Sequence, residues 1–532
     1  MKSRTSFFNT TVFRKDITRF APAWGLYLTG ILLLMLTIFT EDDYHLADTM
    51  SMTIGVLSIV NIGYALVCGA LLFGDLFNHK LCNALHAMPL RREGWFVTHL
   101  VSGLLFSVVP NLIVALCLIP RLDSYWPMAF VWWGGMTATY LFFFGAAVLS
   151  ALCTGSRFAM TLVYGLINFL SILLMWTVQF LYKPLLYGIE IDQEPFVFFS
   201  PVSYLCTHEL SFAYFSTNDG WPYVTGIALV GVAMLVAALF LYRRRHLETA
   251  GDFITVRFLS PVFLVLYTLA AGMALFIFSS VFSVDRDYLF LAVGVTAGFI
   301  TGRMLLRRTV RVFKPATFIG LAVMMAVLFG SLGLAKLDVF GIVRWVPEAE
   351  AVKTVSIRYT DDEVTYTTPE KAEIEELVRI HEGIVAAGGE DNRWSSRIDL
   401  AYTLQDGSVV TRCYPVDYST GEGQAIARLL SKPEYVLDTQ DVSTLWETVN
   451  YITVDKHSTD NTVFVREEAQ SLLDAIIADC GAGLMNQDWN YHTDDTWGYL
   501  ILEKAGDRDV SVLVWNSAVN TVTWLKEHGI NP

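Results

Sequence analysis

Nine apolar stretches of about 20 residues occupy most of the first 340 residues, and they constrain the fold more than any other feature. An α-helix rises 1.5 Å per residue, so about 20 such residues cross the ~30 Å hydrocarbon core of a membrane. The sequence therefore predicts a polytopic α-helical membrane protein with about nine transmembrane helices. The stretches are 22–40, 51–74, 96–119, 127–153, 158–181, 222–242, 260–282, 288–306 and 316–335.

Basic residues are distributed unequally between the two sides of these predicted spans. Eighteen Lys and Arg residues lie on the side of the N-terminus, against five on the opposite side. Because short cytosolic loops are enriched in Lys and Arg, we expect a cytosolic N-terminus and, after nine crossings, an extracytoplasmic C-terminal region. The first apolar stretch is too long for the core of a cleaved signal peptide, so we expect it to remain as a span.

The C-terminal region differs from the rest of the chain in charge. Residues after Arg344 carry a net charge of −19, whereas the residues up to Arg344 carry +5. Such an acidic region is typical of a water-soluble domain, and its charge favours cationic over anionic ligands. The chain therefore divides into a membrane part and an acidic soluble part.

The acidic region contains an internal duplication. The segment "TVSIRYTDDEVTYTTPEKAEIEELVRIHEGIVAAG" recurs loosely as "YITVDKHSTDNTVFVREEAQSLLDAIIADCGAG". Each copy reads as two strands and a helix, and each is followed by a hairpin and a short helix. We expect an α+β extracytoplasmic domain built of two similar ββαββα modules, residues 345–440 and 446–532. Their helices are predicted at 369–388, 422–431, 466–480 and 519–528.

The residues before the first span, 1–21, predict a helix that lies along the cytosolic membrane surface. Charged residues, among them Asp16, stand between its apolar residues and give the helix two faces. The apolar residues recur at helical spacing and are Phe13, Ile17 and Phe20. We expect this apolar face to rest on the membrane.

A basic stretch, "HKLCNALHAMPLRREG", interrupts the apolar runs between the second and third spans. It predicts a short helix at 77–88 that a proline ends. One interpretation is a docking site for a cytosolic partner, and the alternative is a turn whose basic residues follow the charge bias of cytosolic loops. The candidate docking residues are Asn78, Lys80, Leu81, Leu85, Met88, Pro89, Arg91 and Arg92.

This layout resembles the permease subunits of ABC-2-type ABC transporters. The resemblance rests on the surface helix before span one and on "ALHAMPLRREGWFVTHL", which contains an apolar-Pro-x-Arg pattern at Met88 to Arg91. It covers residues 1–245. The segments "GDFITVRFLSPVF" and "RRTVRVFKPATF" are similar to those of bacterial, Firmicute-like permeases that carry an additional outer domain, which extends the resemblance over most of the chain.

The resemblance implies a six-span permease core, residues 22–245, in a bacterial plasma membrane. It implies that the loop after span two docks on a separate cytosolic ABC ATPase, that a second permease, identical or not, completes the path, and that the complex is an exporter. It also implies a pair of short helices that cap the path between spans five and six. Three additional spans, 246–336, follow the core.

Small residues in the eighth predicted span permit close helix packing. They are Gly294, Gly298 and Gly302, in "GVTAGFITG". Spacing of small residues by four lets two helices approach closely in a membrane. We expect packing against spans seven and nine of the same chain, and the alternative is a dimer interface.

The sequence contains no recognisable catalytic motif. It contains no GxxxxGK[ST] motif for a P-loop, and no GxSxG or metal-ligand spacing, so we expect no enzyme activity, no cofactor and no metal. The spans contain almost no ionisable residues, which is not typical of ion-driven transporters. Apart from scattered Ser and Thr, their polar residues are Asn61, Asn111, Asn168 and Gln179. The alternative to a permease is a membrane-anchored envelope sensor or scaffold that acts through the acidic domain.

Overall fold

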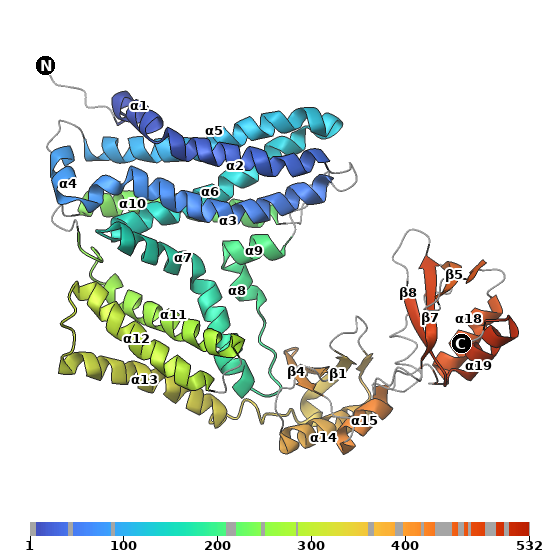
Figure 1. Cartoon of the computed structure of the whole chain (residues 1–532). Coiled ribbons are helices and arrows are strands. Elements are labelled where there is room, and N and C mark those ends of the chain that lie inside the picture. Colours follow the sequence, from blue (N-terminus) through green and yellow to red (C-terminus); the bar gives the residue numbers. More distant parts are fainter. Residues whose placement is uncertain are drawn as a thin grey trace. The chain divides into compact units, whose positions relative to one another are not determined.

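In the computed structural model, the chain divides into two units, and each is described by itself (Figure 1). One unit comprises Met1–Gln179 and Asp192–Ser331, and the other combines Phe180–Ile191 with Leu332–Pro532. The described residues are 7–40, 46–86, 91–208, 220–245, 251–282, 286–359, 366–388, 397–415, 420–430, 449–455, 462–465, 470–482, 484, 496–504 and 510–530.

The first unit is a set of apolar helices. Within the described residues, eight helices are long and apolar enough to cross a membrane, and a ninth is present if α1 (Thr10–Arg19) and α2, which meet at 57°, count as one bent span. The chain is thus a polytopic helical protein with a membrane-embedded part, as predicted. The long helices are α2 (Ala21–Thr40), α3 (Leu46–Leu72), α5 (Arg92–Leu122), α6 (Pro127–Cys153), α7 (Arg157–Thr177), α10 (Trp221–Arg244), α11 (Leu259–Val281), α12 (Asp287–Arg307) and α13 (Pro315–Lys336).

The most buried of these helices is α6, which packs among α3, α5 and α10 (Figure 1). Its large aromatic side chains fill the core, and Trp132, Tyr140 and Phe143 have no exposed surface. The crossing with α10 is close because glycines meet there: a Cβ on Gly145 would lie 2.6 Å from the backbone oxygen of Gly231. Any larger residue at this crossing would force the two helices apart.

The glycines of the eighth predicted span lie against α11. A Cβ on Gly294 or Gly298 would lie 2.7 Å or 2.6 Å from atoms of Ala271, and one on Gly302 would lie 2.8 Å from Leu264. The close approach of α11 and α12 therefore uses all three small residues, and it occurs within one chain. Gly320 of α13 approaches Phe299 of α12 in the same way.

A short backbone ladder joins the three additional helices to the core. The loop between α6 and α7 pairs with the segment before α11: the amide of Gly155 donates to Asp252 O (2.9 Å), and the amide of Gly251 donates to Gly155 O (2.7 Å). The amide of Thr255 donates in the same way to Cys153 O (2.9 Å). These bonds satisfy backbone groups that the ends of α6 and α7 leave unpaired.

Two short helices lie between α7 and α10, where the family resemblance implies such a pair. They are α8 (Glu194–Phe198) and α9 (Pro201–Thr207). The oxygen of Leu205 on α9 lies 2.5 Å from the position of a Cβ on Gly55, so α9 packs directly on the backbone of α3. Pro201 and Leu205 are buried in this contact.

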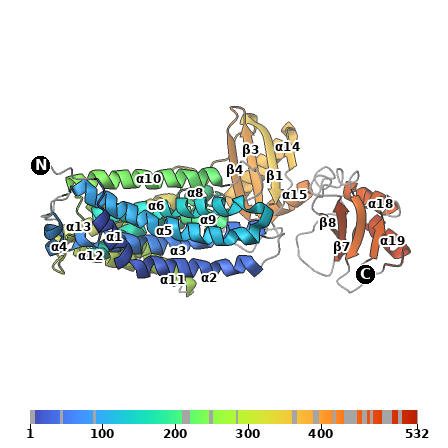
Figure 2. The same ribbon diagram turned by 90° about the horizontal axis from the view of Figure 1, so that it is seen from above.

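The second unit contains two four-stranded antiparallel sheets with the orders β2-β1-β3-β4 and β6-β5-β7-β8. Helices lie against one face of each sheet (Figure 1, Figure 2). The first set comprises β1 (Val352–Tyr359), β2 (Tyr366–Thr368), α14 (Lys371–Ala387), β3 (Arg397–Leu404), β4 (Val409–Pro415) and α15 (Gly421–Leu430). The second comprises β5 (Val449–Asp455), β6 (Thr462–Val465), α18 (Gln470–Gly481), β7 (Thr496–Lys504), β8 (Val510–Trp515) and α19 (Val519–Glu527).

The core of the first sheet alternates along its strands. In β3, Ile398, Leu400 and Tyr402 are fully buried, and the residues between them are partly exposed. This is the period-2 pattern of a sheet with one covered face. The turn between β3 and β4 has Gly407 at φ +84°, a conformation that residues with a Cβ rarely adopt.

A segment from the membrane half of the sequence belongs to this second unit. Residues 180–191, which follow α7, lie at the edge strand β4, where the amide of Cys413 donates to Gly188 O (3.0 Å). Gly188, at φ +77°, lies directly on the ring of Tyr414, and a side chain there would collide with that ring. The domain boundaries predicted from the sequence placed this segment in the six-span core and not with the second unit.

Candidate functional site

The predicted docking loop forms one end of the helical unit. A turn of 3-10 helix, η2 (Gly74–Phe77), leads into α4 (His79–His86). Asn78 caps α4: its side-chain oxygen accepts from the amide of Lys80 at 2.9 Å and from that of Leu81 at 3.5 Å. Asn78 thus acts as the N-cap, a role that its short polar side chain suits.

The basic and apolar residues at this end are exposed. Lys80, Arg91 and Arg92 lie at the surface, and the Leu81 side chain is 48% exposed. Arg91 precedes α5, and its guanidinium carbon lies 5.2 Å from the ring centroid of Phe7, a cation–π distance. This end of the helical unit thus presents exposed cations beside an apolar side chain.

Three predicted docking residues lie partly or wholly outside the part of the chain that the structure describes. Leu85 lies in α4, but its side chain is outside the described residues. Met88 and Pro89, which carry the family-like pattern, fall in the undescribed segment 87–90. The proposed role of these three residues therefore stays a prediction.

Arg245, at the end of α10, anchors the base of α4. Its guanidinium donates to the backbone oxygens of Ala151 (3.0 Å), Leu152 (3.2 Å), Thr154 (3.0 Å) and Leu76 (3.4 Å). The first three acceptors belong to the C-terminal end of α6, where unpaired carbonyls and the helix dipole favour a cation. Burial lowers the pKa of Arg245 from its ordinary value. In the sequence, this residue is only one of several loop cations.

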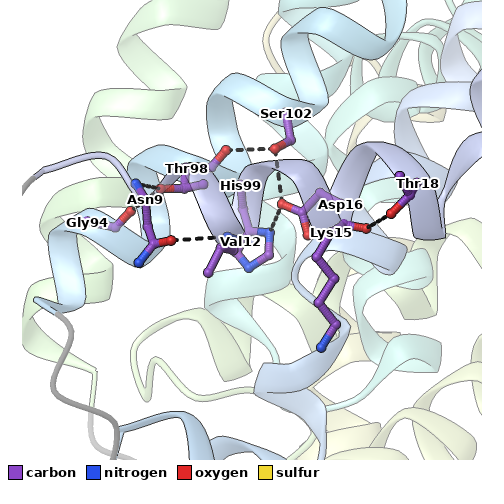
Figure 3. A network of polar contacts seen from close by, with 9 residues as sticks. All are labelled: Asn9, Val12, Lys15, Asp16, Thr18, Gly94, Thr98, His99 and Ser102. Atoms are coloured by element: carbon purple, nitrogen blue, oxygen red, sulfur yellow. Dashed lines mark hydrogen bonds and ion pairs between the residues drawn. The ribbon is translucent and has the colours of Figure 1, made fainter.

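A buried polar cluster connects α1 to α5 at the same end (Figure 3). Nδ1 of His99 lies 2.8 Å from Oδ2 of Asp16, although the nitrogen lacks the geometry of a hydrogen bond to that oxygen. The hydroxyl of Ser102 donates to the same carboxylate at 3.0 Å. The pair is therefore an electrostatic contact, supported by one hydrogen bond from Ser102.

This cluster corrects two expectations. Asp16 was assigned to the charged face of α1, but it is 4% exposed and packs against α5. The predicted spans were expected to contain almost no ionisable residues, but the third contains His99, which is 5% exposed. The Ser102 hydroxyl gives the buried Asp16 carboxylate a hydrogen-bond donor inside the protein.

The start of α1 is fixed on the same face of α5 (Figure 3). The amide of Asn9 donates to the Thr98 hydroxyl at 3.1 Å, and that hydroxyl donates to Gly94 O at 2.6 Å. The side chain of Asn9 caps α1 by accepting from the amides of Thr11 and Val12. Polar contacts thus hold both the first and the second turn of α1.

The apolar residues predicted for α1 are buried to different degrees. Phe20 is 8% exposed and lies in the main core, whereas Phe13 and Ile17 are partly buried. Phe20 approaches Phe106 of α5 edge to face, with 6.4 Å between ring centroids. The buried face of α1 therefore contains Asp16 as well as the expected apolar residues.

Polar residues of the predicted spans join the helices of the core. The hydroxyl of Tyr27 donates to Asn61 Oδ1 at 2.7 Å, and Asn61 Nδ2 donates to the Thr139 hydroxyl at 3.1 Å. Asn111 Nδ2 donates to Ser107 at 3.0 Å. These bonds link α2, α3 and α6 where the membrane offers no water as an alternative partner. They favour a structural role for Asn61 and Asn111.

A second buried polar cluster lies in the first sheet. Nδ1 of His381 on α14 lies 3.0 Å from the Tyr402 hydroxyl, and its Nε2 lies 2.7 Å from the Tyr414 hydroxyl. Burial lowers the pKa of His381 to about 4, and the nearby Arg412 adds to the effect. The imidazole is therefore neutral at neutral pH. Among the described residues, no group of three or more His, Cys, Asp or Glu is placed to hold a metal ion.

In comparisons with protein-family models, with curated proteins and with solved structures, nothing matches this chain.

Proposed function

We propose that the chain is the permease subunit of an ATP-driven ABC exporter. The observation that supports this most is the α4 end of the helical unit. There, a short capped helix and the start of α5 present Lys80, Leu81, Arg91 and Arg92 to solvent. Arg245 anchors the base of this helix to the end of α6. An exposed helix on a fixed base suits a contact that transmits force.

The sequence also supports a division of labour between chains. It contains no P-loop, so hydrolysis of ATP belongs to a separate cytosolic subunit. In this proposal the basic α4 end faces the cytosol, as the distribution of Lys and Arg predicts, and a second permease completes the transport path. Movement of α4 would pass directly into α5, which follows it in the chain and holds α1 through Asp16 and His99.

In this proposal, the second unit, which contains the acidic region after Arg344 and is called the acidic unit below, forms two similar ββαββα modules outside the membrane. Both sheets have the same strand order, and the register shifts at the same place, between Val352 and Thr354 in the first and between Val449 and Tyr451 in the second. A shared irregularity of this kind favours duplication. The modules would gate the path or capture the substrate.

Reversal of charge at the α4 end tests the ATPase contact. The tagged chain is extracted from its native membrane in mild detergent, and co-purifying proteins are identified by mass spectrometry. We expect a stoichiometric P-loop protein with the wild type and its loss with Arg91→Glu/Arg92→Glu. The matched control is Arg307→Glu/Arg311→Glu, which changes two exposed arginines, one at the end of α12 and one after it, and should retain the ATPase.

Two outcomes contradict the proposal in different ways. If the ATPase is retained by Arg91→Glu/Arg92→Glu, the exposed α4 end is not the main docking surface. If the wild type purifies without any P-loop protein, under conditions that keep a known permease–ATPase pair together, the permease assignment fails. The envelope sensor or scaffold then becomes the better interpretation.

A further inference from the structure

A cavity of about 410 Å³ lies beside α4, between the end of α1, the turn η2 and the start of α7. Its walls are both charged and apolar. Arg19, Arg157 and Asp75 contribute the charged groups, and Phe20 and Leu71 lie among its apolar lining. Asn78 and Leu81, two of the candidate docking residues, also line the cavity, but its charged groups are not among those residues, and the inference below does not depend on the ATPase contact.

The three charged side chains have no ion-pair partner among the described residues of the chain. A guanidinium nitrogen of Arg157 lies 3.0 Å from the position that a Cβ on Gly74 would take, so its side chain lies against the start of the η2 turn. Arg19 forms a cation–π contact with Phe20, at 5.2 Å from the ring centroid. Two positive groups and one negative group thus share one solvent-accessible cavity.

The position of the cavity connects it to the lipid surface. Arg19 ends the surface helix α1, and the chain bends by 57° there to enter α2. Leu71 and Arg157 lie at the ends of two other candidate spans, α3 and α7. Span ends and a surface helix mark the headgroup layer of a bilayer, where basic pockets bind lipid phosphates.

We propose that this cavity binds the headgroup of phosphatidylethanolamine. Arg19 and Arg157 would hold its phosphate, because guanidinium groups match phosphate geometry. Asp75 would accept hydrogen bonds from its primary ammonium group. Phosphatidylglycerol carries the same phosphate but a neutral glycerol in place of the ammonium, so it would meet the two arginines equally well and would offer Asp75 hydroxyl groups but no cation.

Lipid competition tests the proposal on the full chain. The purified protein receives equal amounts of phosphatidylethanolamine and phosphatidylglycerol in detergent, and native mass spectrometry measures the lipid that stays bound. We expect about threefold more phosphatidylethanolamine than phosphatidylglycerol, the size of one partly solvated ion pair. Asp75→Asn should reduce this ratio to about one or below, and Arg157→Gln should weaken retention of both lipids.

Control variants separate ligand contact from misfolding. Arg157→Lys, which keeps the positive charge, should restore part of the binding that Arg157→Gln loses. Arg307→Gln, at an exposed arginine outside the cavity, should leave retention unchanged. Equal retention of the two lipids by the wild type, or an unchanged ratio in Asp75→Asn, would overturn the proposal.

Soluble competitors distinguish a lipid from a free phosphate compound. O-phosphoethanolamine and inorganic phosphate are added at rising concentration to the protein with bound phosphatidylethanolamine. We expect displacement only far above the lipid concentration, because the acyl chains add apolar contact area outside the cavity. If either compound displaces the lipid at equal concentration, the site binds a soluble phosphate compound and the lipid assignment is wrong.

Discussion

Nδ1 of His99 on α5 lies 2.8 Å from Oδ2 of Asp16 on α1, and both side chains are 6% exposed. The pair fastens the surface helix to the helix that follows the candidate docking loop. A surface helix held only by apolar residues can roll on its support, whereas a buried carboxylate that accepts a hydrogen bond from Ser102 has one preferred arrangement. The contact therefore fixes the rotation of α1 relative to α5.

Removal of Asp16 should destabilise the helical unit. Asp16→Ala leaves His99 and the Ser102 hydroxyl buried without their carboxylate, and we expect a loss of about 3 kcal/mol in the free energy of unfolding. Asp16→Asn, which keeps an acceptor for Ser102, should cost less. Thermal unfolding of the full chain in detergent measures both effects. Lys15→Ala, at an exposed neighbour, is the control, and equal melting temperatures for Asp16→Ala and Lys15→Ala would contradict the assignment.

Substitution of Arg245 should weaken the base of α4. Arg245→Ala leaves four backbone oxygens without their donor and should lower the free energy of unfolding by about 3 kcal/mol. Arg245→Lys should recover only part of the loss, because an ammonium group cannot span acceptors on both α6 and η2. Hydrogen exchange of the α4 amides reports the local effect.

The neighbouring arginine provides the control for this prediction. Arg244 ends α10 beside Arg245 and is exposed, so Arg244→Ala removes the same charge without removing the four bonds. We expect its α4 amides to exchange at the wild-type rate. Equally fast exchange in Arg244→Ala and Arg245→Ala would show that charge, rather than the bonds to α6 and η2, stabilises this end.

The positions of the helices follow from the sequence, whereas the contacts of single polar residues do not. Hydrophobicity over 20 residues is a local property, so the apolar stretches coincide with the long helices within a few residues. Asp16 was predicted to be exposed because its neighbours Lys15 and Arg14 are charged. Its burial depends on His99, more than 80 residues away, and no local pattern contains that partner.

The same limit explains Arg245 and the segment 180–191. Arg245 is the last of three consecutive arginines. It differs from its neighbours because its guanidinium binds the end of α6. Gly188 belongs to an apolar loop in the sequence, yet it packs on Tyr414 at the edge of β4. An edge strand accepts any extended segment with free backbone groups, so the sequence carries no specific signal for the match.

Enlargement of Gly298 should separate α11 from α12. A Cβ at this position would lie 2.6 Å from the Cβ of Ala271, so Gly298→Ala requires a helix to move, and we expect a cost of about 2 kcal/mol. Gly330 of α13 has no atom within 4 Å of its Cβ position and provides the matched control. Thermal unfolding should show a lower melting temperature for Gly298→Ala than for Gly330→Ala. Equal values would mean that α11 and α12 do not pack closely.

The proposed duplication makes the His381 cluster open to a specific test. Tyr402 pairs with Val355 and Val410 in the first sheet, and at the matching place in the second sheet Leu502 pairs with Ile452 and Val510. By the same register, Tyr414 corresponds to Val514. Three of the buried residues on each helix share their spacing, and they are Leu377, Val378 and His381 on α14 and Leu472, Leu473 and Ile476 on α18. The second sheet thus has apolar residues in place of His381 and both tyrosines.

Acid should destabilise the first sheet through His381. Its pKa falls to about 4 in the folded chain, whereas an unfolded histidine titrates near 6.5. Between these pH values the unfolded chain binds more protons than the folded chain. The contribution of His381 to the stability of the first sheet is therefore complete above pH ~6.5, and it is lost as the pH falls toward about 4. The total loss is ~3 kcal/mol. Hydrogen exchange of the β3 and β4 amides, measured from pH 7 to pH 4 and corrected for the intrinsic rate, follows this change.

The apolar residues of the second sheet supply the comparison. The triple variant His381→Ile/Tyr402→Leu/Tyr414→Val has no histidine to titrate in this cluster. In it, the hydrogen-exchange protection of the β3 and β4 amides should no longer depend on pH between pH 6.5 and 4. The pKa of Tyr414 is raised to about 12, so neither the wild-type tyrosine nor its loss adds a titration in this range. The amides of β7 and β8, in a sheet whose described strands contain no histidine, serve as an internal reference. A pH dependence that persists in the triple variant would assign the acid sensitivity to other groups, such as the many carboxylates of the acidic unit.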